Sequence, residues 1–236
     1  FVFEGSHTYT DAQIPALNWD QNLDTLFLFH EDHTIRTLVR GGSDSSWTLA
    51  DFTLTNLPTV VFDNTASGTG TPSAEGTAGG TVTFTSGSSN FVAGDVGKFI
   101  RGNGGYGEIT GYTSATVVTL TIVQPFNDAD AIANGLWAME EVAYSSARGW
   151  RVSGTIFQGR LVLAGAKSLP DFFAASRSGV IKNFANSDAD DDSAIVAFGD
   201  TPGISTFLNV YGGRHLQIFA NDAEFYIPKS ESDPIT

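Results

Sequence analysis

The chain has 236 residues, of which 41% are hydrophobic and 12% aromatic, enough for a folded body with a substantial core. Its formal net charge of -14 argues against binding nucleic acid through phosphate neutralisation, and the absence of cysteine excludes disulfides and thiolate metal sites. Only 16% of the residues are charged, so we expect either partners that cover part of the surface or a surface kept soluble by Thr, Ser, Asn and Gly. No long apolar run and no leader-like start are visible, so we expect no membrane partner.

The first elements in chain order are short. The segment TDAQIP predicts a helical turn, with Thr10 or Asp11 as its N-cap. The run Leu26–Phe29 is apolar at every position, which predicts a strand covered on both faces. Glu31–His33 supplies a turn after it, and Trp47 begins a further strand.

The middle of the chain has a different character. Residues 64–80 are dominated by Gly, Thr, Ser and Ala, which predicts a linker or a long loop. Four short predicted strands follow, at Thr81–Thr85, Gly97–Arg101, Tyr106–Tyr112 and Thr116–Val123. We therefore predict that residues 66–142 form a small β-barrel domain, inserted into a β body made of residues 1–65 and 143–236.

A β-hairpin pattern recurs three times, at Thr25–Val39, Arg160–Ser176 and Arg214–Ile227. Each copy has an apolar strand, a short turn and a second strand rich in Phe, Ile or Val. Hairpins that cannot bury their own faces must stack on neighbours. No window has a sustained helical period, so we predict an all-β fold in which hairpin blades form a partial β-propeller-like body that carries the inserted small β-barrel domain.

Two clusters of polar residues are candidate metal sites. His30 and His33 flank Glu31 and Asp32, but a zinc site needs three or four converging ligands, and we expect these side chains to point outward from a tight turn. The acidic stretch Asp188–Asp192 is rich in carboxylates, which Ca²⁺ favours, yet it lacks the glycine and the distal glutamate of an EF-hand loop. A solvated loop, a loop capping an arginine and a calcium site remain open there.

The glycine-rich motifs give no sign of catalysis. Gly102–Gly107 has no lysine and no following helix, so we predict a flexible turn rather than a phosphate cradle. Gly87–Ser89 does not form a nucleophile elbow, and no carboxylate pair is singled out for glycoside hydrolysis. We therefore predict no catalytic, cofactor-binding or metal-binding residues, and a chain that is not an enzyme.

Two sets of side chains could serve binding. One is a loose basic cluster, which fits either pairing with the acidic loop or a subunit contact: Arg148, Arg151, Arg160, Arg177 and Lys182. The other is the four tryptophans, which fit either a sugar-stacking platform or core and interface anchors: Trp19, Trp47, Trp137 and Trp150.

Four groups of motifs, in this order, resemble the tail tubular proteins (nozzle or tail-stabilisation proteins) of short-tailed bacteriophages. They are Tyr9–Gln21 with Asp24–His30 and Thr34–Leu38; Asp95–Arg101 with Gly107–Thr110 and Pro125–Phe126; Arg148–Trp150 with Phe157–Gly165 and Ala175–Gly179; and Phe184 with Asp190–Ile195 and Leu216–Phe225. The resemblance implies a propeller-like body with an inserted barrel, assembled as a ring of usually six copies below the portal. It offers no catalytic residues to carry over.

From the resemblance we expect a structural virion protein of a phage or prophage tail, made in the cytoplasm of a bacterial host. Its expected partners are copies of itself, portal or adaptor proteins and a tail fibre or needle, while DNA passes without specific binding. Members of that family are longer, so this chain would hold part of the propeller. The alternative is a carbohydrate-binding or adhesin-type β module.

Overall fold

The structure is a computed structural model that describes residues 7–43, 45–63, 65–186, 191–199, 205–228 and 235. This described part is all-β, as predicted, and its helices are two short 3-10 turns, η1 (Ile14–Ala16) and η2 (Ala93–Asp95). None of its helices has the length and apolar character needed to cross a membrane. The chain forms two compact units, and the second begins at Thr59, seven residues before the predicted boundary at 66, and ends at Val142.

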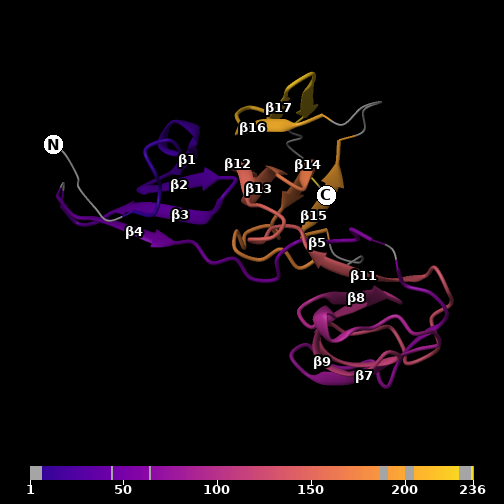
Figure 1. The fold of residues 1–236 in the computed structure, drawn as a ribbon. Coiled ribbons are helices and arrows are strands. Elements are labelled where there is room, and N and C mark those ends of the chain that lie inside the picture. The colour runs from indigo at the N-terminus through magenta and orange to yellow at the C-terminus, as the bar shows by residue number, and fades with distance from the viewer. Residues whose placement is uncertain are drawn as a thin grey trace. The chain divides into compact units, whose positions relative to one another are not determined.

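The first unit contains three antiparallel sheets, in each of which the strand order follows the chain (Figure 1). Sheet 1 consists of β1 (Asn18–Asn22), β2 (Thr25–His30), β3 (His33–Arg40) and β4 (Trp47–Asp51). Sheet 2 consists of β12 (Arg151–Phe157), β13 (Arg160–Ala166), β14 (Leu169–Ala175) and β15 (Ile195–Phe198). Sheet 3 consists of β16 (Phe207–Gly212), β17 (Leu216–Ala220) and β18 (Glu224–Ile227).

The three predicted hairpins are present, and each forms the second and third strands of its sheet. Thr25 pairs with Val39, Val162 with Ala175, and Leu216 with Ile227. The repeating unit is longer than the predicted hairpin, because a further strand precedes it every time. That first strand carries many polar residues in sheet 1, where it reads NWDQN, so its apolar pattern is too weak to reveal it.

Sheet 2 is the middle layer of a stack, and every residue of β13 is buried. On one of its faces the Phe29 ring of sheet 1 lies over Gly154, where a Cβ atom would come within 2.6 Å of the ring. On its other face, Val162 and Ala164 share a buried cluster with Leu216 of sheet 3. The first strands of successive sheets also touch, β1 against β12 and β12 against β16.

Sheet 1 ends the stack, which corrects one prediction for its second strand. Phe27 and Phe29 are buried, but Leu26 and Leu28 are only half-buried. The strand is therefore fully covered on one face and not on both, because the stack contributes a neighbouring sheet on one side only. The predicted N-cap, Thr10 or Asp11, is also wrong, because Gln13 occupies the N-cap position of η1 and no side chain caps the turn.

The second unit is one seven-stranded sheet in the order β5-β11-β8-β9-β10-β7-β6. Its strands are β5 (Thr59–Val60), β6 (Gly70–Pro72), β7 (Thr81–Ser86), β8 (Phe99–Gly102), β9 (Gly105–Ser114), β10 (Val117–Gln124) and β11 (Trp137–Val142). The edge strand β6 makes two backbone hydrogen bonds (2.9 and 2.7 Å) between Gly70 and Ile132, just before β11. Residues 64–80 therefore supply a strand, and the prediction of a linker is wrong for this part.

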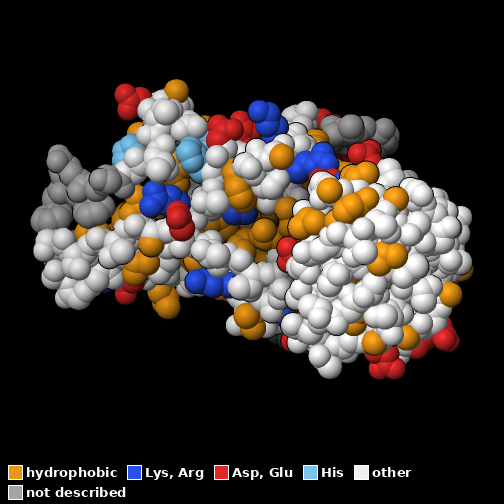
Figure 2. Space-filling view, turned by 60° about the horizontal axis from the view of Figure 1, so that its bottom comes forward, with side chains coloured by type: hydrophobic (Ala, Val, Ile, Leu, Met, Phe, Trp, Pro, Cys, Tyr) orange, Lys and Arg blue, Asp and Glu red, His pale blue; other side chains and the backbone are white. Residues whose placement is uncertain are grey.

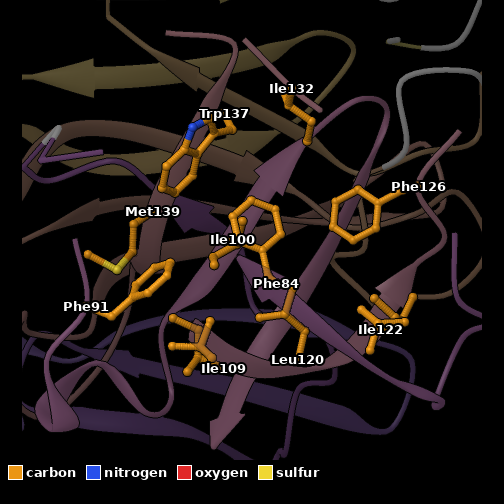
Figure 3. Close-up of a cluster of buried hydrophobic side chains, with 12 residues drawn as sticks. Phe84, Phe91, Ile100, Ile109, Leu120, Ile122, Phe126, Ile132, Trp137 and Met139 are labelled. Carbon is orange, nitrogen blue, oxygen red and sulfur yellow. The ribbon is translucent and has the colours of Figure 1, made fainter. Parts of the chain in front are cut away.

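One face of this sheet surrounds a core centred on Phe84 (Figure 3). The Phe84 ring lies 5.2 Å from that of Trp137 and 6.5 Å from that of Phe91, measured between centroids. Trp137 is 3% exposed and donates its indole N–H to the carbonyl of Gly68 (3.0 Å). Trp137 is thus a core anchor of the second unit and no part of a surface platform.

Candidate functional site

The two turn histidines do not point outward, which corrects that prediction. His30 is 5% exposed, and its ring lies 5.3 Å from that of His33, its partner across the turn. Tyr9 packs edge-on against His33 at 4.8 Å. The side chains gather because the segment before sheet 1 returns over the end of the hairpin, a long-range contact that the turn sequence does not encode.

Hydrogen bonds assign a structural role to this cluster. The backbone N–H of Asp32 donates to Nδ1 of His30 (3.1 Å), which requires that nitrogen to be unprotonated. Nε2 of His33 donates to Oε1 of Gln13 (3.0 Å), which ties η1 to the hairpin. Burial and the neighbouring His30 lower the pKa of His33 below its ordinary value. Across the described residues, no three or more His, Asp or Glu side chains gather as metal ligands.

The acidic stretch is described only from Asp191 onward, so Asp188 and Asp190 lie outside the described residues. Oδ1 of Asp192 pairs with Nη2 of Arg177 at 2.6 Å. The backbone carbonyl of Asp191 accepts a hydrogen bond from Arg160 (3.0 Å). The described part of the loop therefore caps two arginines of the same chain, while a calcium site at Asp188–Asp192 stays a prediction.

Arg160 anchors that loop from inside the first unit. It is fully buried, and its Nη1 donates to the carbonyls of Ser176 (2.7 Å) and Ser193 (2.6 Å). These acceptors join the end of β14 to the segment before β15, so one cation ties two strands through their backbone. Burial lowers the pKa of Arg160 below its ordinary value, although the guanidinium stays charged at neutral pH.

Two further basic residues of the predicted cluster, Arg151 and Lys182, lie against aromatic rings of the chain. The guanidinium of Arg151 lies 5.2 Å from the Tyr144 ring centroid and 5.3 Å from that of Trp150. Burial lowers the pKa of Arg151 to about 10, which keeps it cationic at pH 7. Nζ of Lys182 lies 4.7 Å over Phe52. These contacts support intramolecular pairing, and the subunit contact at the basic cluster stays a prediction.

The glycine-rich loop at 102–107 is the turn between β8 and β9. Asn103 and Gly104 have φ values of 46° and 70°, the left-handed pair that a tight two-residue hairpin turn requires. Asn103 donates to Oδ1 of Asp128 (2.7 Å), which fastens the turn to a neighbouring loop. At Gly87 the backbone N–H donates to the carbonyl of Thr69 (2.8 Å), so this glycine holds β6 against β7. Both motifs therefore make contacts that hold this sheet together.

The tryptophans are spread over the chain. Trp19 is 66% exposed on β1, whereas Trp47 is half-buried on β4, at the opposite edge of sheet 1. Trp150 is half-buried beside Arg151. Because Trp137 is in the core, the four residues do not converge on one sugar-stacking platform.

What the described residues do offer is a broad, half-exposed apolar surface on sheet 1. The outer face of sheet 1, as we call it, is the set of side chains that the strand register places opposite Phe27 and Phe29. Its apolar members are Trp19, Leu26, Leu28, Leu38, Trp47 and Leu49, and its polar members are Gln21, Arg36, Arg40 and Asp51. A hollow of about 460 Å³ opens on it between Leu26, Leu38 and Trp47. A second hollow of about 250 Å³ lies between Leu28, Leu38 and Leu49 of the sheet and the segment before β1, which contributes His7, Tyr9, Ile14 and Leu17.

The surroundings of this face suit docking better than chemistry. The charged groups at the first hollow, Asp24 and Arg40, pair with each other at 3.0 Å. In the view of Figure 2 most of the molecular surface is uncharged, with Asp, Glu, Lys and Arg confined to small groups. No sequence signal distinguished this face, because Leu26 and Leu28 are as apolar as Phe27 and Phe29 on the other side of the strand.

Comparison with known proteins adds no assignment. No protein-family model matches the sequence, and no curated protein matches it. The resemblance to tail tubular proteins therefore depends on the motifs alone.

Proposed function

We propose that this chain is a structural virion protein of a phage or prophage tail, forming part of a ring-shaped connector or nozzle below the portal. The observation that carries the proposal is the stack of three similar sheets, in which Leu26 and Leu28 on the outer face of sheet 1 are only half-buried. Such a surface is suited to assembly. The resemblance of the sequence motifs to tail tubular proteins is the reason for proposing a ring.

In more detail, we propose that the first unit is a segment of a β-propeller. Each of its sheets is an antiparallel meander, and the first strands of successive sheets touch, as blades do around a common axis. The second unit would be the small inserted β-barrel, and the bridge between Gly70 and Ile132 supports that interpretation.

The charge of the chain fits passage of DNA. A net charge of -14 repels phosphates and discourages adhesion of DNA to the walls of a channel. The proposed partners are copies of this chain, portal or adaptor proteins above and a tail fibre or needle below. The proposed location is the virion tail, after synthesis in the host cytoplasm, and the proposed role involves no catalysis.

Measurement of the particle tests the proposal. We expect light scattering to give a mass of several copies, and negative-stain images to show rings with a central channel. We expect no shift of duplex DNA in gels at low salt. A homogeneous monomer at high protein concentration, or tight DNA binding, would contradict the proposal.

The carbohydrate-binding alternative is weaker because the tryptophans are dispersed. Its best remaining candidate is Trp19, the exposed one. Binding on a glycan array that disappears in Trp19→Ala would favour this alternative over the ring.

A further inference from the structure

The segment before β1 is fastened to sheet 1 by one side chain. We call this segment, residues 7–17, the strap. Among the described residues, Gln13 makes both of the hydrogen bonds that join the strap to the hairpin of β2 and β3. Its Oε1 accepts the Nε2–H of His33 (3.0 Å), and its Nε2 donates to Oδ2 of Asp32 (3.3 Å).

Apolar contacts under the strap are incomplete. The strap and the outer face of sheet 1 together line the hollow of about 250 Å³, so the apolar side chains on it lack contacts that close packing would supply. Ile14, at the start of η1, is 46% exposed. The two hydrogen bonds of Gln13 therefore contribute a large share of the attachment of the strap.

These hydrogen bonds depend on two histidines in contact. The rings of His30 and His33 lie 5.3 Å apart. Nδ1 of His30 accepts the backbone N–H of Asp32 (3.1 Å), so this nitrogen carries no proton in the structure. A proton on it would place two N–H groups against each other and would remove the acceptor that holds the turn.

The Asp32 carboxylate is placed to respond to such a proton. Its Oδ2, the oxygen that accepts the hydrogen bond from Gln13, lies 3.9 Å from Nδ1 of His30. A hydrogen bond between an imidazolium and a carboxylate is stronger than one between a neutral amide and a carboxylate. Protonated His30 would therefore draw this oxygen away from Gln13, and the strap would lose one of its two hydrogen bonds.

The charges around His33 disfavour a second proton while the strap is in place. The titratable and charged groups that surround the ring are His7 and Tyr9 of the strap, His30 of β2, Glu31 and Asp32 of the turn, Arg36 of β3 and Asp51 of β4. Asp51 is paired with Arg36 (3.2 Å), and the segment before β12 contributes only the uncharged Trp150, whose N–H donates to the carbonyl of Glu31 (2.7 Å). Burial and the neighbouring His30 and Arg36 lower the pKa of His33, so acid favours a state in which its ring is released to water.

We propose that the strap is a pH-sensitive cover: between pH ~7 and ~5, protonation of His30 and His33 releases residues 7–17 from sheet 1. Release exposes Leu28, Leu38 and Leu49, which line the hollow under the strap. The sheets themselves stay folded, because Phe27 and Phe29 are buried on the opposite face of sheet 1. All of these groups belong to one chain, so failure of this inference leaves the connector function unaffected.

Nuclear magnetic resonance of the aromatic rings tests the release. The Tyr9 and His33 rings lie 4.8 Å apart across the strap, and the Phe207 and Phe225 rings of sheet 3, 5.2 Å apart, serve as the internal control. On acidification from about pH 7 to about pH 5, the cross-relaxation signal between Tyr9 and His33 should fall at least fivefold while the control signal stays constant. A Tyr9–His33 signal that persists at the lower pH, or a parallel loss of both signals, would overturn the inference.

Variants identify the groups responsible. His30→Asn keeps an acceptor for the Asp32 N–H but cannot be protonated, so the Tyr9–His33 signal should keep more than half its strength at about pH 5. The matched control is His215→Asn, which changes a histidine packed on Tyr226 in sheet 3 and should release the strap as the wild type does. Release of the strap in His30→Asn at the wild-type pH would show that His30 has no part in it.

A further variant opens the strap without acid. Gln13→Ala removes both hydrogen bonds to the hairpin, so the Tyr9–His33 signal should be weak already at about pH 7, with the Phe207–Phe225 signal unchanged. Full strength of the Tyr9–His33 signal in this variant would show that Gln13 does not hold the strap, which would also overturn the inference.

Discussion

The two units cover the apolar faces of their sheets in different ways. In the second unit a backbone bridge joins Gly70 of the edge strand β6 to Ile132, before β11, and one face of the single sheet surrounds the core around Phe84. The first unit stacks separate sheets, which buries both faces of sheet 2 but one face each of sheets 1 and 3. A sheet that surrounds its own core buries that face without a second sheet. Sheets 1 and 3, at the two ends of the stack in the described residues, each have a second face with no sheet of this unit against it.

The largest expected effect is on the core of the second unit, which a single sheet surrounds. Phe84→Ala should lower the free energy of unfolding of the second unit by about 4 kcal/mol, because a fully buried ring against Trp137 and Phe91 leaves a large cavity. Hydrogen exchange followed region by region measures it. Protection should fall in β7–β10 and stay unchanged in sheet 2. Equal loss in both units would show that they unfold as one.

The next effect concerns Arg160, which holds the loop before β15 by hydrogen bonds to its backbone carbonyls. Arg160→Met should cost about 3 kcal/mol, because it leaves several buried backbone carbonyls without their donor. Urea unfolding of the first unit measures this loss. The control is Arg177→Met, which removes a pair with the exposed Asp192 and should cost much less than Arg160→Met, because water screens the pair. Similar losses in the two variants would show that the buried cation has no special role.

A third pair of variants compares equivalent positions in a covered and an uncovered face. Leu161→Ala should cost about 3 kcal/mol and Leu26→Ala about 1 kcal/mol, because only the first side chain is fully buried. Denaturant titration at low protein concentration gives both values. Equal costs in the two variants would contradict the difference in cover.

The smallest effect is a pH dependence confined to sheet 1. The pKa of His33 is lowered in the folded chain, chiefly by burial, so below pH ~6.5 the unfolded chain takes up this proton more readily. The contribution of His33 to the free energy of unfolding is therefore fully present above that pH, and it is lost as the pH drops toward 5. His33→Gln should flatten the change, as measured by hydrogen exchange of β2 and β3. The second unit contains no histidine and serves as the internal control.

Local patterns were enough to predict the all-β class and the three hairpins. Apolar alternation and short polar turns are encoded within about fifteen residues, as in Arg160–Ser176. The first strand of sheet 1 was missed because its residues Asn18 and Asp20 are polar and make contacts with sheet 2, more than 130 residues away in the chain. Strand β6 was missed because glycine and threonine dominate it, and pairing with β7 is what defines it as a strand.

The sequence by itself determined the all-β class, the positions of the three hairpins and the absence of thiol chemistry, since these follow from residue types and short spacings. Tertiary structure alone decided which apolar faces are covered. Leu26 and Leu161 occur in almost the same local sequence, yet one is half-buried and the other fully buried. It also decided that His30 and His33 turn inward, toward Tyr9. Burial depends on which side chains lie across the face, and these are remote in the chain, as Phe29 is from Gly154.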